Sequence, residues 1–127
     1  METTWPAPIG AITLFVDDLA AARQFYLDVF GLPVHFEDAD SVVLDFGNTL
    51  INLLVTTAAP ELIAPAPVGT GDGVRFQFTI NVADVDAVCS KLTGRGITLL
   101  NGPIDRPWGI RTASFRDPDG YVWEIAS

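Results

Sequence analysis

The chain contains an internal repeat, and this feature limits its possible folds more than any other. Residues 15–21 (FVDDLAA) align with residues 81–87 (NVADVDA) at an offset of 66 residues. In both copies an apolar run leads to an aspartate, then to an apolar helical pattern and a glycine. A repeated unit of this size predicts two similar supersecondary modules within one chain.

The first module is predicted to be one strand, one helix and three further strands. An apolar run over residues 9–16 predicts a buried strand, and Asp17-Asp18 offers a carboxylate cap for the helix that follows. Apolar residues recur with helical period up to Gly31, where the helix should end. Strands are expected over residues 32–36, 41–46 and 49–56, with Gly47-Asn48 joining the last two as a tight hairpin.

The second module repeats this order. A strand is expected over residues 75–82, a helix over 84–93, and strands over 97–100, 112–116 and 121–126. The turn Asp117-Pro118-Asp119-Gly120 joins the last two strands. Two βαβββ modules predict an α+β fold in which a cupped mixed sheet carries its helices on the outside.

We predict a single domain over residues 1–127. Its repeats cover about 9–56 and 75–126, and a Pro/Gly-rich linker over residues 57–74 joins them. Modules exchanged between two chains would satisfy the same pattern, so a homodimer is expected.

Composition restricts the class of protein. The chain has 127 residues, of which 49% are hydrophobic and 18% charged, and this balance excludes a disordered chain. No apolar run has the length of a membrane span, and we expect no secretory signal. The single cysteine, Cys89, cannot form an internal disulfide and lies on the apolar stripe of the second helix, where we expect it to pack. A cytoplasmic protein is therefore expected.

The charge is strongly acidic and unevenly distributed. A net charge of −9 argues against nucleic acid as a partner, because phosphate recognition needs a basic surface. Residues 1–60 hold eight acids and one base. Such an acidic surface either attracts a cationic ligand or keeps the protein soluble, and the sequence leaves both open.

Motifs at both ends of the chain resemble one known superfamily. They are Asp17-Asp18-Leu19, Phe25-Tyr26, Phe30-Gly31-Leu32, Asp117-Pro118-Asp119-Gly120-Tyr121 and Glu124. Together they resemble the glyoxalase, bleomycin-resistance and ring-cleaving dioxygenase group, also called vicinal oxygen chelate, over residues 9–126. This resemblance implies the fold described above. It says little about activity, because the fold hosts several chemistries.

The resemblance also allows a test for a metal site. Enzymes of this group hold one divalent metal with His, Glu or Gln from four strands, and the resemblance assigns those positions to Ala11, Asn52, Gln77 and Glu124. Ala11 has no ligand atom, and the single histidine, His35, lies outside the set. One carboxylate and two amides make a weak cage. We therefore expect no metal, no cofactor and no catalytic residue. Strand alternation would place the four positions on the face shared by Thr13, Leu54, Thr79 and Val122.

Glu124 keeps two interpretations. Burial could raise its pKa and make it a general base. Alternatively, Gln77 or Asn52 could satisfy its carboxylate by hydrogen bonding.

A second resemblance favours binding over catalysis. Residues 106–118 resemble the Pro-Trp-Gly-Arg…Arg-Asp-Pro stretch of bleomycin-resistance proteins, which are metal-free dimers that sequester a drug in grooves between subunits. The resemblance implies that Trp108 stacks on a planar ligand and that Phe36 forms the opposite wall. Trp108 could instead plug one end of the sheet. Phe46 and Phe115 could line the cup or pack in the core.

The predicted function is metal-independent binding of a small molecule. The protein would confer resistance without turnover by sequestering a planar aromatic antibiotic in a groove at the dimer interface. The acids Glu37, Asp38 and Asp40 favour a cationic ligand, whereas Arg75, Arg106 and Arg111 would accommodate a neutral or anionic one. A glyoxalase-like lyase or a ring-cleaving dioxygenase with an atypical metal site is the alternative, and a metabolite sensor is a third. The ligand-binding residues are predicted to be Phe36, Phe46, Asn52, Gln77, Trp108, Arg111, Phe115 and Glu124.

Overall fold

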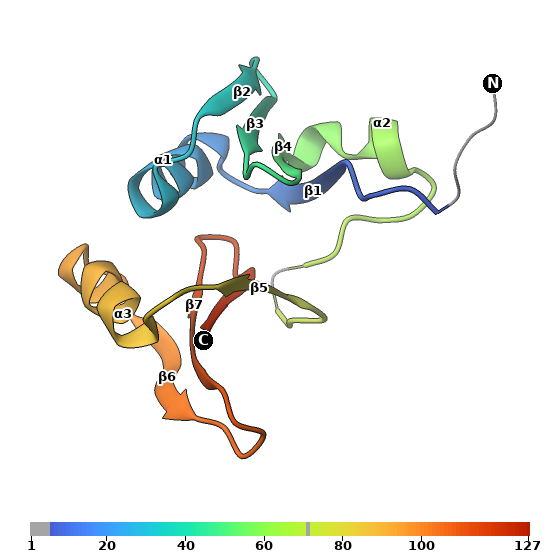
Figure 1. The fold of residues 1–127 in the computed structure, drawn as a ribbon. Helices are drawn as coiled ribbons and strands as arrows, with labels where there is room; N and C mark the ends of the chain where they lie inside the picture. Colours follow the sequence, from blue (N-terminus) through green and yellow to red (C-terminus); the bar gives the residue numbers. More distant parts are fainter. Residues whose placement is uncertain (1–5, 71) are drawn as a thin grey trace. The chain divides into compact units, whose positions relative to one another are not determined.

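The computed structural model describes residues 6–70 and 72–127. The chain forms two compact units, the first extending to Val68 and the second beginning at Gly69 (Figure 1). This boundary falls within the Pro/Gly-rich stretch noted in the sequence. No helix in the described part of the chain is long and apolar enough to cross a membrane.

Unit 1 has the predicted order of one strand, one helix and three strands. Its elements are β1 (Ala11–Val16), α1 (Leu19–Phe30), β2 (Val34–Glu37), β3 (Ser41–Asp45) and β4 (Leu50–Val55). The sheet order is β1-β4-β3-β2, in which β1 and β4 run parallel and the other pairs antiparallel.

Unit 2 repeats this architecture. Its elements are β5 (Gln77–Asn81), α3 (Val85–Gly94), β6 (Leu99–Asp105), β7 (Arg111–Arg116) and β8 (Val122–Ala126). The sheet order is β5-β8-β7-β6, again with one parallel pair, β5 with β8. The α+β class and the two βαβββ modules predicted from the repeat are therefore confirmed.

The two helices begin with the same capping interaction. Asp18 accepts a hydrogen bond of 3.0 Å from the backbone N–H of Ala21, and Asp84 accepts one of 3.1 Å from Ala87. These aspartates are 66 residues apart, so the repeat seen in the sequence is also a repeat of local structure. Gly31 ends α1 in the left-handed conformation, with φ of 62°.

Two segments differ from the sequence prediction. The predicted linker contains a short 3-10 helix, η1 (Thr56–Ala58), and the helical turn α2 (Pro60–Ile63). Pro60 is compatible with α2 because a proline is well tolerated in the first turn of a helix.

Strand β6 extends to Asp105, beyond the expected end at residue 100. Its register against β7 shifts twice, and Gly102 and Pro103 conceal the strand pattern in the sequence.

Each helix covers one face of its own sheet. In unit 1, Ala22 and Tyr26 of α1 are fully buried, as are Leu44 and Leu53 of the sheet. Arg23 of α1 also forms an ion pair of 2.8 Å with Glu37 of β2. The opposite face of each sheet carries the polar residues considered next.

Candidate functional site

The face opposite α1 carries a polar pair at its centre. The strand register aligns Thr13 of β1 with Asn52 of β4, and Asn52 with Val43 of β3. Residues paired in this way share a face, so Phe36, which pairs with Val43, lies on it too. The Nδ2 atom of Asn52 donates a hydrogen bond of 3.4 Å to Thr13 Oγ1.

The other side-chain atom of Asn52 lacks a partner. Its Oδ1 is buried, and no donor from the described residues reaches it. A buried acceptor without a hydrogen bond costs about 1–3 kcal/mol. A ligand that brings an N–H or O–H group to this point would remove that cost.

The face opposite α3 carries the equivalent pair. The register aligns Thr79 of β5 with Glu124 of β8, and Glu124 with Ser114 of β7. Thr79 Oγ1 donates a hydrogen bond of 3.0 Å to Glu124 Oε1. Within unit 2, the hydrogen bond to this carboxylate thus comes from Thr79, and none comes from the described Gln77 side chain.

Gln77 lies on this same face. It is two residues before Thr79 on β5, and it pairs with Val122 of β8. Its amide is exposed, as are the side chains of Thr79 and Asn81. On β5 and β8 this face therefore presents the Glu124 carboxylate beside the neutral side chains of Gln77, Thr79 and Asn81.

The donor set does not fit a catalytic divalent metal. Ala11 offers no ligand atom, and Asn52 offers a neutral amide. Among residues 6–70 and 72–127, no three His, Cys, Asp or Glu side chains are grouped so that they could hold a metal ion. His35 lies on β2 and is exposed.

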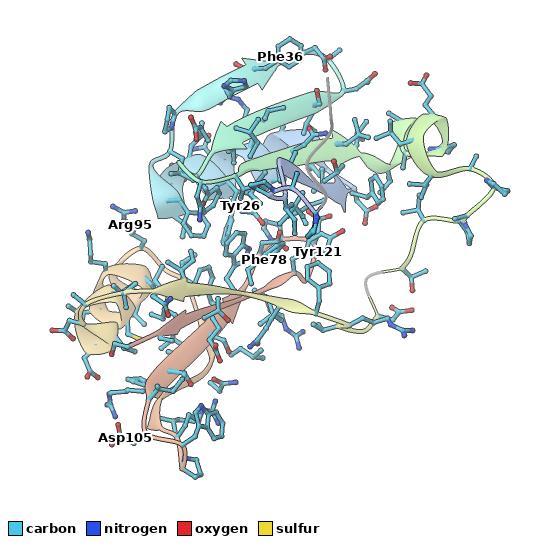
Figure 2. All side chains as sticks on the ribbon, turned by 45° about the vertical axis from the view of Figure 1, so that its right-hand side comes forward. Tyr26, Phe36, Phe78, Arg95, Asp105 and Tyr121 are labelled. Carbon is cyan, nitrogen blue, oxygen red and sulfur yellow. The ribbon has the colours of Figure 1, made fainter. Side chains whose placement is uncertain are left out.

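Phe36 and Trp108, the two residues predicted to stack on a ligand, are both accessible to solvent. Phe36 lies at the outer edge of the sheet of unit 1, with 53% of its surface exposed (Figure 2). Trp108 lies in the turn between β6 and β7 and is 69% exposed. Trp108 therefore does not plug the end of a sheet. The two rings belong to different units, so their cooperation in one ligand site stays a prediction.

Arg106 holds the Trp108 loop. Its guanidinium carbon lies 6.0 Å from the centroid of the indole ring, within cation–π range. Its Nε donates a hydrogen bond of 2.8 Å to the buried Thr112 Oγ1 on β7. This arginine connects the exposed ring to the sheet.

Two aromatic residues of the predicted set lie on the helix side of their units. Phe115 is 1% exposed and pairs with Trp123 and Leu99, whereas the next residue along, Ser114, shares the face of Glu124. The Phe46 ring packs at 5.4 Å against Phe30 of α1. The structure therefore places both in hydrophobic packing against the helix side and not on the faces that carry Asn52 and Glu124.

Arg111 is engaged in ion pairs. It donates to Asp86 on α3 at 2.9 Å and to Asp105 on β6 at 2.9 Å. These hydrogen bonds raise the pKa of Arg111 and lower that of Asp86. The Arg111 side chain thus connects the helix of unit 2 to its sheet, and its position is explained without a ligand. Figure 2 labels Asp105 near the end of the β6–β7 hairpin.

The sequence interpretation missed the hydrogen-bonding role of the two threonines. Thr13 and Thr79 are also 66 residues apart, so the internal repeat could have identified them as equivalent positions. Cys89 is 5% exposed, and burial raises the pKa of its thiol, which agrees with a packing role.

Comparison with known proteins identifies the family. Residues 9–125 match the model of the Glyoxalase/Bleomycin resistance protein/Dioxygenase superfamily. The chain is 32% identical over 119 residues to the uncharacterized protein YraH of Bacillus subtilis, covering 90% of this chain and 93% of YraH. It is 28% identical over 121 residues to virulence protein STM3117 of Salmonella typhimurium, covering 93% and 82% of the two chains.

Solved structures agree with this assignment. A glyoxalase/bleomycin resistance protein/dioxygenase from Nocardioides superposes with a TM-score of 0.86 at 23% identity, covering 98% of this chain and 85% of the other. A lactoylglutathione lyase from Agrobacterium tumefaciens superposes with a TM-score of 0.77 at 28% identity, covering 95% and 93%. The chain belongs to the glyoxalase/bleomycin resistance protein/dioxygenase superfamily.

Proposed function

We propose that this protein binds a small organic molecule without a metal ion and protects the cell by sequestering it. The observation that carries the proposal is the buried Oδ1 of Asn52, which lacks a donor among the described residues. Glu124 presents a second acceptor at the equivalent position of the other repeat. Because both side chains present acceptor atoms, the ligand is proposed to carry several N–H or O–H groups.

The ligand is proposed to be planar, aromatic and cationic. Trp108 offers an exposed ring that Arg106 holds in place, and Phe36 offers a second exposed ring. Aromatic side chains supply large contact areas at low entropic cost. Glu124 and the excess of acids in unit 1 would favour a positive charge on the ligand.

Sequestration requires affinity and abundance only. Asn52, Gln77 and Glu124 would orient the ligand, and the two aromatic rings would stack on it. The groove is proposed to form between two copies of the chain. No proton transfer or bond cleavage is required of any residue.

The test is a calorimetric titration with metal-free bleomycin, a cationic antibiotic with a planar aromatic part. We expect one ligand per subunit, and at least about tenfold weaker binding for Trp108→Ala and for Glu124→Gln. Leu62→Ala serves as the control, because Leu62 is a 63% exposed apolar side chain of α2 outside the proposed set. Equal affinity of the wild type and both site variants would overturn the proposal, as would the absence of any heat of binding.

A lyase is the second candidate. Gln77 and Glu124 keep ligand-capable atoms, and the Agrobacterium structure of lactoylglutathione lyase is 28% identical to this chain. The discriminating assay is turnover of the hemithioacetal of methylglyoxal and glutathione with added Ni²⁺, Zn²⁺ or Mn²⁺. Metal-dependent turnover that Glu124→Gln abolishes would replace sequestration by catalysis.

A further inference from the structure

Unit 2 contains a hollow outside the residues of the proposed function. Its volume is about 470 Å³, within the range of ligand pockets. The hollow lies where the chain leaves α3 and enters β6. Its lining residues are Gly96, Ile97, Thr98, Leu99, Leu100 and Arg116.

The wall of the hollow is largely aliphatic. Ile97 and Leu99 are half-buried, and Leu100 is 45% exposed. An aliphatic chain lying against them would remove apolar surface from water, which stabilises a complex by roughly 25 cal/mol per Å².

Arg116 supplies the single charge of this wall. It is the last residue of β7 and is exposed, and within the described part of the chain no carboxylate forms an ion pair with it. Arg111, on the same strand, is held by two aspartates. Arg116 is thus a cation on a regular strand whose hydrogen-bond donors remain available to a ligand.

The net charge of unit 2 is small. From Gly69 onward the chain has seven acidic and six basic residues, a net charge of −1. The acidic excess of the protein belongs to unit 1. A planar guanidinium beside aliphatic side chains matches a carboxylate that carries an apolar chain, because the guanidinium binds both carboxylate oxygens at once.

We infer that the hollow formed by residues 96–100 and Arg116 binds a small aliphatic carboxylate. This would be a second ligand site, lined by residues other than Asn52, Glu124 and Trp108, and of opposite charge preference. It depends on unit 2 alone.

The experiment is an NMR titration of the ¹⁵N-labelled full-length protein with octanoate. We expect saturating shifts of the backbone amides of residues 96–100. Octanamide, which has the same chain without the charge, should bind at least about tenfold more weakly, because a hydrogen bond to a charged group contributes about 1.5–3 kcal/mol.

Two variants locate the charge contact. Arg116→Gln should weaken octanoate binding at least about tenfold, and its own spectrum will show whether it is folded. Arg75→Gln should bind octanoate as the wild type does, because Arg75 is an exposed arginine of unit 2 that does not line the hollow. The inference is wrong if octanoate produces no saturating shift at residues 96–100. It is equally wrong if octanamide or Arg116→Gln matches the wild-type affinity for octanoate.

Discussion

Thr79 Oγ1 lies 3.0 Å from Glu124 Oε1 and donates a hydrogen bond to it across the parallel pair β5 and β8. In unit 1 the equivalent threonine, Thr13, accepts instead, because Asn52 stands where the second repeat has a carboxylate. The two repeats thus keep one geometry and reverse the direction of the hydrogen bond. This reversal leaves Asn52 Oδ1 as a buried acceptor that no described residue satisfies.

Replacing Asn52 by leucine should stabilise the protein. The substitution removes the unsatisfied acceptor and loses only a hydrogen bond of 3.4 Å, so we expect the free energy of unfolding to rise by about 1 kcal/mol. Urea unfolding monitored by circular dichroism measures this change.

Thr13→Val is the matched contrast. It leaves Asn52 Nδ2 without its acceptor, and we expect the free energy of unfolding to fall by about 1 kcal/mol. If Asn52→Leu were the more destabilising of the two, the orphaned acceptor would not be the dominant effect.

Much of the fold could be predicted because its signals are local. The caps at Asp18 and Asp84, the stop at Gly31 and the hairpin at Gly47-Asn48 all lie in short stretches of sequence. The repeat then predicted the same order of helix and strands along the chain in both units, but not the order of the strands within each sheet. Strand β6 was harder to predict, because Gly102 and Pro103 interrupt an otherwise extended segment.

The site could be predicted only in part, because it depends on which face of a strand a residue occupies. Alternation shows that Ser114 and Phe115 point to opposite faces, but only the pairing of β7 with β8 shows that Ser114 is the one beside Glu124. Trp108 was easier to place, because a loop flanked by proline and glycine keeps its ring at the surface.

Gly102, the glycine of β6, is predicted not to tolerate a side chain. Its φ is 82°, and a Cβ atom there would meet the backbone of Thr112 and lie 2.7 Å from Cα of Ala113. Gly102→Ala therefore combines left-handed strain with a backbone clash, and we expect a loss of about 3 kcal/mol in unfolding free energy.

Gly109→Ala controls for the strain alone. Gly109 has φ of 96° but open space around it, so the expected loss is about 1 kcal/mol. Chemical denaturation of both variants separates the two effects, and equal losses would show that the clash at Gly102 relaxes without cost.

The ion pairs of Arg111 predict a change in the acid sensitivity of the protein. Hydrogen bonds from Arg111 lower the pKa of Asp86 below its ordinary value. A carboxyl group whose pKa is lowered by folding adds stability above its unfolded pKa, about 3.9, and this contribution is lost as the pH falls through the lower folded value.

Arg111→Gln should therefore flatten the acid limb of the stability curve. We expect its urea midpoint to change less than that of the wild type between about pH 6 and about pH 2. Arg75→Gln should keep the wild-type slope, because no carboxylate of the described residues pairs with Arg75. Identical slopes for Arg111→Gln and the wild type would show that these pairs are screened by solvent.

Truncation should cost much more stability at Phe115 than at Trp108. Phe115 is 1% exposed, so Phe115→Ala should leave a cavity and lower the unfolding free energy by about 3–5 kcal/mol. Trp108 is 69% exposed, so Trp108→Ala should change stability by less than about 1 kcal/mol.

The proposed ligand site adds a second expectation for Trp108. The Trp108→Ala variant must bind metal-free bleomycin more weakly while remaining fully folded. Thermal unfolding and calorimetry on the same samples measure both quantities. A large loss of stability in Trp108→Ala with unchanged affinity would assign the ring to packing and remove it from the ligand site.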